Sequence, residues 1–153
     1  MVHGGSTLVY GEDKCYEWKP ESECRSFRQV LVIKRLDAQP EAPATVVTSI
    51  DSFPGANRPQ WSWDERRIAF GVAPASDPNN SQIYVISRDG TGLTQLTFDS
   101  EDQPGAGAPS WSPDNSQIVY EAHGNRFGGE FWVMNADGSD PQNQTQGRID
   151  FPK

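Results

Sequence analysis

The residues best suited to bond-breaking chemistry are scarce and scattered in this chain. Its 153 residues include two histidines, His3 close to the N-terminus and His123 in the second half. An α/β-type serine hydrolase presents its nucleophile in a Gly-x-Ser-x-Gly turn, and the sequence has no such pentapeptide. Ser6 follows His3-Gly-Gly, but no triad partners are placed around it. These residues predict a protein that is not an enzyme.

The acidic residues define neither an acid–base pair nor a metal site. Asp13, Glu17, Glu21 and Glu23 share one polar stretch, which is typical of a solvated face. The segment 135–140 is rich in oxygen ligands but lacks the spacing and the terminal Glu of an EF-hand loop. A tight turn explains it more simply, so we expect no metal and no cofactor.

The two cysteines, Cys15 and Cys24, have eight residues between them and lie in the same polar stretch. With no histidine beside them, they lack the further ligands of a zinc site. A disulfide that pins a loop would imply an oxidising compartment. Two reduced thiols are the alternative, and the sequence leaves both open.

Charge and hydropathy narrow the class of partner. The chain has 21 acidic and 13 basic residues and no basic run longer than a pair, which argues against nucleic acid and anionic membrane as partners. No apolar stretch approaches the roughly 18 residues of a membrane helix. The first residues have neither a basic n-region nor an apolar h-region, so no signal peptide is visible and a cytoplasmic location stays open.

One segment combines side chains suited to binding. His123, Asn125, Arg126 and Phe127 lie within residues 123–129, which also contain three glycines. Loops on one face of a repeat array often form its binding surface. We therefore predict that these four residues belong to a partner-binding loop, with a long hairpin connection as the alternative.

The elements that must position this loop are written twice in the sequence. Residues 59–70 return as residues 109–120, each copy beginning Pro-x-Trp-Ser-x-Asp. Residues 83–90 return as residues 131–138, each copy ending in Asp-Gly. Short runs of β-branched and aromatic residues between turn residues indicate strands. Self-similarity at this period predicts the stacked, four-stranded blades of a β-propeller.

We expect an all-β fold: a partial β-propeller of about three four-stranded antiparallel blades. Nothing before Ser6 resembles Trp-Ser-Pro-Asp, so the first blade should lack its inner strand. Residues 11–28, with both cysteines, are expected to be a polar insertion in that blade. The expected limits are about 7–48 for blade 1, 58–97 for blade 2 and 108–145 for blade 3, with the start of a next blade at 146–153.

Several repeated residues have a predicted structural role. Trp61 and Trp111, at matching positions, are expected to pack between adjacent blades. In the later copy of the turn, Pro113 fixes φ, Asp114 accepts hydrogen bonds from amides just ahead, and Asn115 tolerates a left-handed conformation. The earlier copy has Trp and Glu in place of that Pro and Asn, so its turn is expected to be less tightly specified. The Asp-Gly pairs at 89–90 and 137–138 predict hairpin turns.

The repeated motif resembles the WD-repeat-like unit of the TolB β-propeller family. The resemblance rests on residues 59–70, 83–90, the Gln-Leu-Thr at 95–97, and the second copies at 109–120 and 131–138. It implies a propeller without chemistry of its own, a protein partner bound at the propeller face, and a periplasmic or extracellular location. Similar propellers also serve as gating domains of prolyl-oligopeptidase-like serine peptidases and as the scaffold of oligogalacturonate lyase.

These observations favour a non-catalytic module for protein–protein interaction, in the cell envelope if the resemblance holds. The alternative is a gating or scaffold part of a larger serine peptidase or polysaccharide lyase. A propeller ring needs about four to eight blades. We therefore expect the chain to be part of a longer protein or to complete its ring by self-association, with no nucleic acid partner and no membrane insertion.

Overall fold

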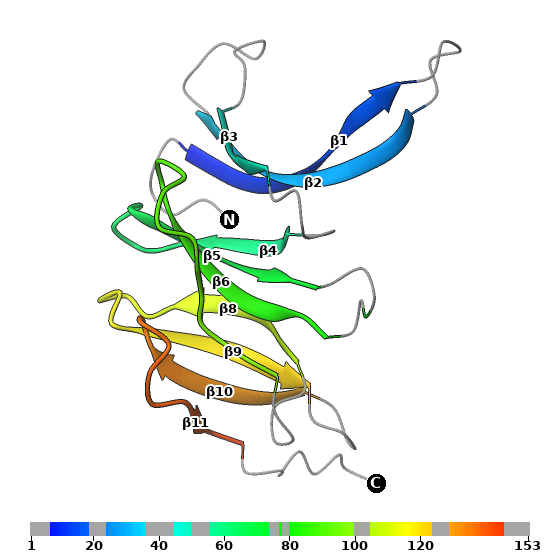
Figure 1. Ribbon diagram of the computed structural model, residues 1–153. Helices are drawn as coiled ribbons and strands as arrows, with labels where there is room; N and C mark the ends of the chain where they lie inside the picture. Colours follow the sequence, from blue (N-terminus) through cyan, green and yellow to red (C-terminus); the bar gives the residue numbers. More distant parts are fainter. Residues whose placement is uncertain are drawn as a thin grey trace, which may run out of the picture.

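The computed structural model describes residues 7–18, 24–35, 45–49, 56–73, 77, 80–99, 105–123 and 129–145. All regular structure in these residues is β-strand (Figure 1). The strands are β1 Thr7–Trp18, β2 Cys24–Arg35, β3 Thr45–Ser49, β4 Ala56–Trp61, β5 Arg67–Val72, β6 Gln82–Ser87, β7 Thr94–Gln95, β8 Ala106–Trp111, β9 Gln117–His123, β10 Gly129–Asn135 and β11 Gln142–Asn143.

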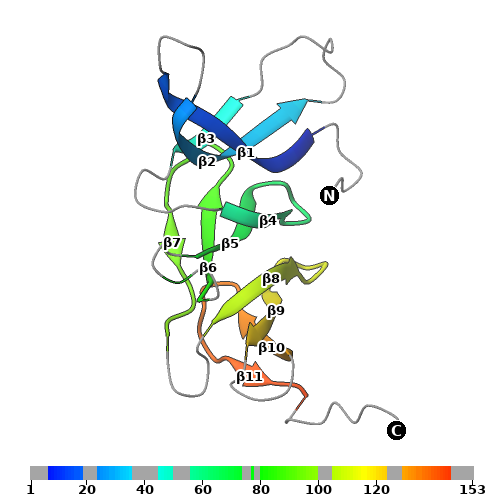
Figure 2. The same ribbon diagram turned by 90° about the vertical axis from the view of Figure 1, so that its right-hand side faces the viewer.

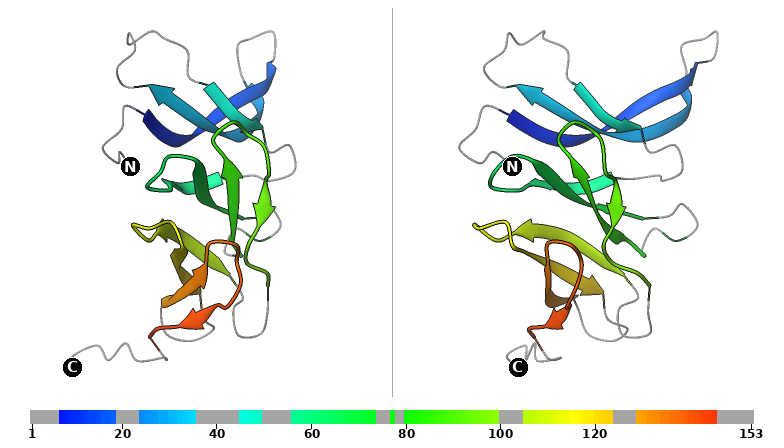
Figure 3. Two further views of the ribbon diagram at one scale, coloured as in Figure 1. Left: turned by 90° about the vertical axis from the view of Figure 1, so that its left-hand side faces the viewer. Right: turned by 60° about the vertical axis from the view of Figure 1, so that its left-hand side comes forward.

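The strands form three antiparallel sheets in chain order. β1-β2-β3 is a three-stranded sheet, and β4-β5-β6-β7 and β8-β9-β10-β11 are four-stranded sheets. Figures 2 and 3 show the sheets stacked one on another, with β1–β3 at one end and β8–β11 at the other. This arrangement confirms the expected fold class, a partial β-propeller whose first blade lacks its inner strand. Residues 146–153, the expected start of another blade, lie outside the described residues.

The first blade differs from the sequence-based expectation in one respect. Residues 11–18 and 24–28 are not a polar insertion but continue the two strands of a long hairpin. Pairing runs from Gly11 opposite Leu31 to Trp18 opposite Cys24, with register shifts between Cys15 and Trp18. The expectation was wrong because a ladder is held by backbone hydrogen bonds, which polar side chains do not prevent from forming.

The core between the first and second blades is built around Trp61, which is 1% exposed. Val9, Leu31 and Ile33 reach it from the first blade. From its own blade it is joined by Ile68, Phe70, Val72, Tyr84 and Ile86. The rings of Phe70 and Tyr84 stack with centroids 6.2 Å apart. The predicted packing of Trp61 between blades is confirmed.

The core between the second and third blades repeats this plan around Trp111, which is 5% exposed. Ala69, Ile83 and Val85 reach it from the second blade. Ile118, Tyr120, Ala122 and Met134 reach it from the third. Each tryptophan ends the first strand of its blade and lies against the preceding blade, so the repeated residue repeats the same interface.

Candidate functional site

The predicted partner-binding loop falls mostly outside the described residues. His123 is the last residue of β9, and its backbone pairs with Gly129 at the start of β10. Asn125, Arg126 and Phe127 lie outside the described residues, as does the side chain of His123. The structure thus places the two ends of the loop side by side, and the binding role of the four residues stays a prediction.

The two cysteines lie on the two strands of the long hairpin. The backbone of Cys15 pairs with that of Phe27, and the backbone of Cys24 pairs with that of Trp18. Their side chains are outside the described part of the chain. The disulfide also stays a prediction.

The described residues instead bring together the turns that follow the first strand of each blade. In the third blade, the Asn115 amide donates to the Ser112 carbonyl at 2.9 Å, and the Ser112 amide donates to the Gln117 carbonyl at 3.0 Å. Asp114 Oδ1 accepts from the Ser116 amide at 3.0 Å, and Asn115 has φ 61°. The predicted roles of Asp114 and Asn115 are confirmed.

The second blade forms the same turn with different residues. The Glu65 amide donates to the Ser62 carbonyl at 2.9 Å, and Glu65 takes the left-handed position with φ 55°. Asp64 Oδ1 accepts from Ser62 Oγ at 2.6 Å and from the Arg66 amide at 3.2 Å. The backbone geometry therefore survives the replacement of Pro and Asn by Trp63 and Glu65.

The aspartates of these turns are held ionised. The Ser112 hydroxyl, helped by the amide and hydroxyl of Ser116, lowers the pKa of Asp114 from 3.8 to about 2. The Ser62 hydroxyl lowers the pKa of Asp64, against a smaller opposing effect of burial. A carboxylate that accepts several hydrogen bonds is stabilised in its charged form.

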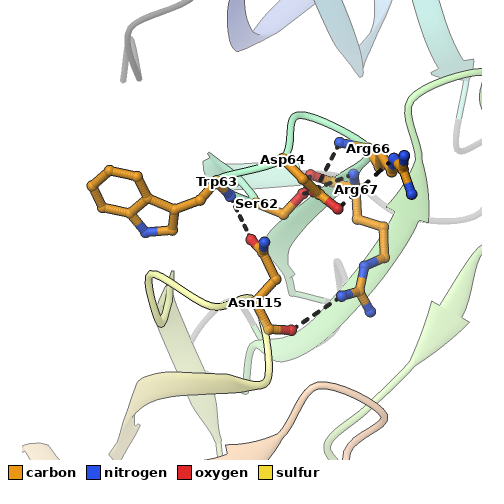
Figure 4. A network of polar contacts seen from close by, with 6 residues as sticks. All are labelled: Ser62, Trp63, Asp64, Arg66, Arg67 and Asn115. Carbon is orange, nitrogen blue, oxygen red and sulfur yellow. Dashed lines mark hydrogen bonds and ion pairs between the residues drawn. The ribbon is translucent and has the colours of Figure 1, made fainter.

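The turns of neighbouring blades are joined to each other. The Trp63 amide donates to Asn115 Oδ1 at 2.6 Å, and the Trp63 indole Nε1 donates to the Trp111 carbonyl at 3.3 Å. Arg67 donates through a guanidinium N–H to the Asn115 carbonyl at 3.2 Å and lies over the Trp111 ring, 4.5 Å from its centroid. Figure 4 shows the Trp63 ring projecting away from this network.

The turns at the outer hairpins complete the same surface. The Arg88 amide donates to the Arg66 carbonyl, and the Ala136 amide donates to the Ser116 carbonyl, each at 2.9 Å. These bonds tie the two turns of each blade together. We call the resulting surface the turn face; it consists of residues 62–67, 88–91, 112–117 and 136–139.

Charged side chains also lie on the turn face. Arg88 lies 3.2 Å from Glu65 Oε2, which also accepts from Thr7 Oγ1 of the first blade at 3.0 Å. Trp63 itself is 50% exposed although its amide and its indole N–H are both hydrogen-bonded. A large, partly exposed aromatic ring on a fixed backbone is suited to anchor a protein partner, because tryptophan is enriched among the residues that dominate protein interfaces.

Sequence reasoning treated Trp63 only as a departure from the turn pattern. The available signal was the size of the replacement, because a turn position filled by Pro113 in one copy holds an indole in the other. A turn does not require an aromatic side chain at this position, so the tryptophan indicated a role beyond the turn itself.

A metal-binding cluster and a membrane-spanning helix are both absent from the described part of the chain. No cluster of three or more His, Cys, Asp or Glu side chains there could hold a metal ion. No helix there is long and apolar enough to span a membrane.

Comparison with known proteins relates the chain to others through its fold. No family model matches the sequence, and no curated protein matches it. Among solved structures, a putative TolB from Agrobacterium tumefaciens is similar with a TM-score of 0.58 and 20% identity, over 86% of this chain and 48% of that one. An oligogalacturonate lyase in complex with manganese gives a TM-score of 0.65 and 18% identity, over 90% and 38%. Pyrococcus horikoshii acylaminoacyl peptidase gives 0.57 and 15%, over 91% and 24%.

Stacked antiparallel sheets, of which the second and third each begin with a strand that ends in a buried tryptophan packed on the preceding sheet, define a β-propeller. Within that class the fold is TolB-like, as the motif in residues 59–70 and 109–120 indicated and the TolB structure bears out. The chain spans about half the length of that TolB structure and less of the lyase and the peptidase.

Proposed function

We propose that this chain is a non-catalytic β-propeller module that binds a protein partner through its turn face. The observation that carries the proposal is Trp63, whose ring is half exposed while its backbone is held by a bond to the next blade. Little side-chain freedom remains to be lost on binding, which favours affinity. Tryptophan is among the residues that most often dominate a protein interface.

The charge of the chain fits a protein partner better than a nucleic acid. The net charge is −8, and the basic side chains of the turn face alternate with acidic ones. Together with the TolB-like fold, this supports a role in the bacterial cell envelope, either periplasmic or extracellular. Reduced cysteines would instead fit a cytoplasmic module.

The loop at 123–129 is a second candidate surface at the other ends of the strands. β9 runs from Gln117, which belongs to the turn face, to His123 at the start of the loop, so the loop begins at the end of this strand far from the turn face. A substitution on one surface therefore tests it without touching the other.

The alternative function is that of a gating or scaffold segment in a larger serine peptidase or polysaccharide lyase. It is supported by the structural similarity to an acylaminoacyl peptidase and to an oligogalacturonate lyase, of which the chain spans 24% and 38%. Coding sequence downstream that contains a Gly-x-Ser-x-Gly turn and a late histidine would favour this alternative.

The test compares two exposed aromatic residues. The wild-type chain, Trp63→Ser and Phe98→Ser are immobilised and exposed to a bacterial envelope extract, and bound proteins are quantified by mass spectrometry. Phe98 is 65% exposed and lies beyond the turn face, which makes it the matched control. We expect one protein to bind wild type and Phe98→Ser equally and to bind Trp63→Ser at least about tenfold less. Absence of any enriched protein, or equal loss in both variants, would contradict the proposal.

A further inference from the structure

Two equivalent tryptophans differ in one buried polar atom. Trp111 Nε1 donates to the Gln60 carbonyl at 3.3 Å, and Gln60 lies in the inner strand of the preceding blade. Trp61 Nε1 is buried, and it has no hydrogen-bond partner among the residues that the structure describes. A buried N–H donor without a hydrogen-bond partner destabilises the fold, so such a group calls for a partner.

The repeat indicates where that partner belongs. Gln60 pairs with Ala69 in the sheet, and Ala69 packs against Trp111. In the first blade Val9 occupies the position equivalent to Ala69. Val9 pairs with Ile33 in the sheet, just as Ala69 pairs with Val85. Val9 also packs against Trp61, just as Ala69 packs against Trp111. The missing carbonyl therefore belongs to a strand lying beside β1, opposite Val9.

Among the described strands, β1 lies at the edge of its sheet. The order of its sheet is β1-β2-β3, whereas β5 and β9 have β4 and β8 on the equivalent side. An edge strand presents unpaired N–H and C=O groups that an extended segment can pair with. The edge and the orphaned indole N–H point to the same absent element.

We propose that residues 149–153 of a second copy of this chain form that element. The residues read Ile-Asp-Phe-Pro-Lys, and they match Ala-Asn-Arg-Pro-Gln at 56–60 and Ala-Gly-Ala-Pro-Ser at 106–110. Each segment has an aliphatic residue first and a proline fourth. Lys153 stands where Gln60 stands, so its carbonyl is the acceptor for Trp61 Nε1.

The position of the strands favours a second copy over the same copy. β11, the last strand before residues 149–153, lies at the opposite end of the stack from β1 (Figure 1). Eight residues follow Thr145, and they belong by sequence to a blade beyond the third. Two copies would supply six sheets, within the about four to eight blades that close a propeller ring.

The outer face of the third blade supports the same arrangement. Val119 and Phe131 are 38% and 52% exposed there. Val119 pairs with Val133 as Ala69 pairs with Val85, so Val119 is equivalent to Ala69. The face of the second blade that contains Ala69 is covered by the third blade. The equivalent face of the third blade is the one that contains Val119. In the proposed dimer the first blade of the second copy covers it, and the head-to-tail contact closes after two copies.

The test is the mass of the chain in solution over a range of concentrations. Light scattering of wild type should show a dimer, twice 16.9 kDa, that dissociates on dilution. Trp61→Phe keeps an aromatic side chain, though a smaller one, and removes the N–H, and it should raise the dimer Kd about three- to tenfold. Trp111→Phe is the matched control: it loses the bond to Gln60 within one copy and should leave the Kd unchanged.

A second measurement uses the wild-type chain, so it does not require any variant to fold. A synthetic peptide of residues 146–153, added in excess, should convert the wild-type dimer to monomer by occupying the edge of β1. A chain that is monomeric at every concentration would overturn the proposal. A dimer that the peptide does not dissociate, or one that Trp61→Phe and Trp111→Phe weaken equally, would also overturn it.

Discussion

Asp64 and Asp114 occupy equivalent places in two turns, and each carboxylate organises its turn by accepting hydrogen bonds from the residues around it. Ser112 Oγ donates to Asp114 at 2.6 Å and itself accepts from the Gln117 amide at 2.9 Å. The carboxylate and the serine thus satisfy polar groups that the strands cannot, which explains why Ser and Asp recur together.

The hydrogen bonds to Asp114 predict an acid-sensitive turn. The pKa of Asp114 is about 2 in the fold, below the 3.8 of an unrestrained aspartate. A lowered pKa means that the carboxylate stabilises the fold fully above about pH 4, and that this contribution is lost as the pH falls towards 2. Ser112→Ala should raise the pKa of Asp114, and Ser116→Ala should raise it less, as measured from the NMR shift of its carboxyl carbon.

The control for this titration is Ser139→Ala. Ser139 Oγ donates to Asp137 at 2.6 Å in the outer hairpin, so its removal should leave the Asp114 titration unchanged. A pKa of Asp114 that is the same in wild type and Ser112→Ala would contradict the account of this turn.

At the scale of single residues, the sequence predicted those side-chain roles that depend on neighbours close in the chain. The roles of Asp114 and Asn115 follow from turn residues that act within a few positions of themselves. The anchor role that we propose for Trp63 was not predicted, because its bonds go to Asn115 and Trp111 in another blade. Contacts between repeats cannot be read from one turn.

At the scale of elements, the Asp-Gly hairpins have a specific geometry. Gly90 and Gly138 have φ of 85° and 88°, whereas Asp89 and Asp137 are not in the left-handed region. The Ser87 amide donates to the Thr91 carbonyl, so three residues lie between the paired ends. This is the three-residue hairpin with a left-handed glycine, rather than the two-residue hairpin that Asp-Gly most often signals.

Gly138 should be harder to replace than Gly92. A Cβ there would lie 3.1 Å from the Leu96 carbonyl oxygen of the second blade, in addition to the strain of a left-handed alanine. Gly92, with φ 66°, would meet only Ser87 Oγ at 3.5 Å. In urea denaturation we expect Gly92→Ala to cost about 1 kcal/mol, and Gly138→Ala at least about 1 kcal/mol more. Equal losses would show that the hairpin does not pack on the second blade.

The strands themselves were predictable where turns bound them closely. β5, β6, β9 and β10 overlap the repeated segments 59–70, 83–90, 109–120 and 131–138, whose short apolar runs between turn residues indicated strands. The long β1–β2 hairpin was not expected, because polar residues such as Glu12 and Asp13 hid a ladder that depends on backbone pairing alone.

At the scale of the whole molecule, the fold is held by two copies of one interface. Trp61 joins the first blade to the second, and Trp111 joins the second to the third. A tryptophan buried at 1% or 5% exposure stabilises the stack by several kcal/mol, which a phenylalanine of smaller area only partly replaces. The sheets therefore depend on their neighbours, as blades of a propeller do.

The central claim is that each repeated tryptophan seals its blade against the preceding one. The most direct test is a set of NMR cross-relaxation contacts between indole protons and assigned methyl groups. The account predicts contacts from the Trp61 ring to Leu31 and Ile33, and from the Trp111 ring to Ile83 and Val85. A Trp61 ring that contacts only methyl groups of its own sheet, or a Trp111 ring without contacts to Ile83 and Val85, would contradict the stacked-blade account.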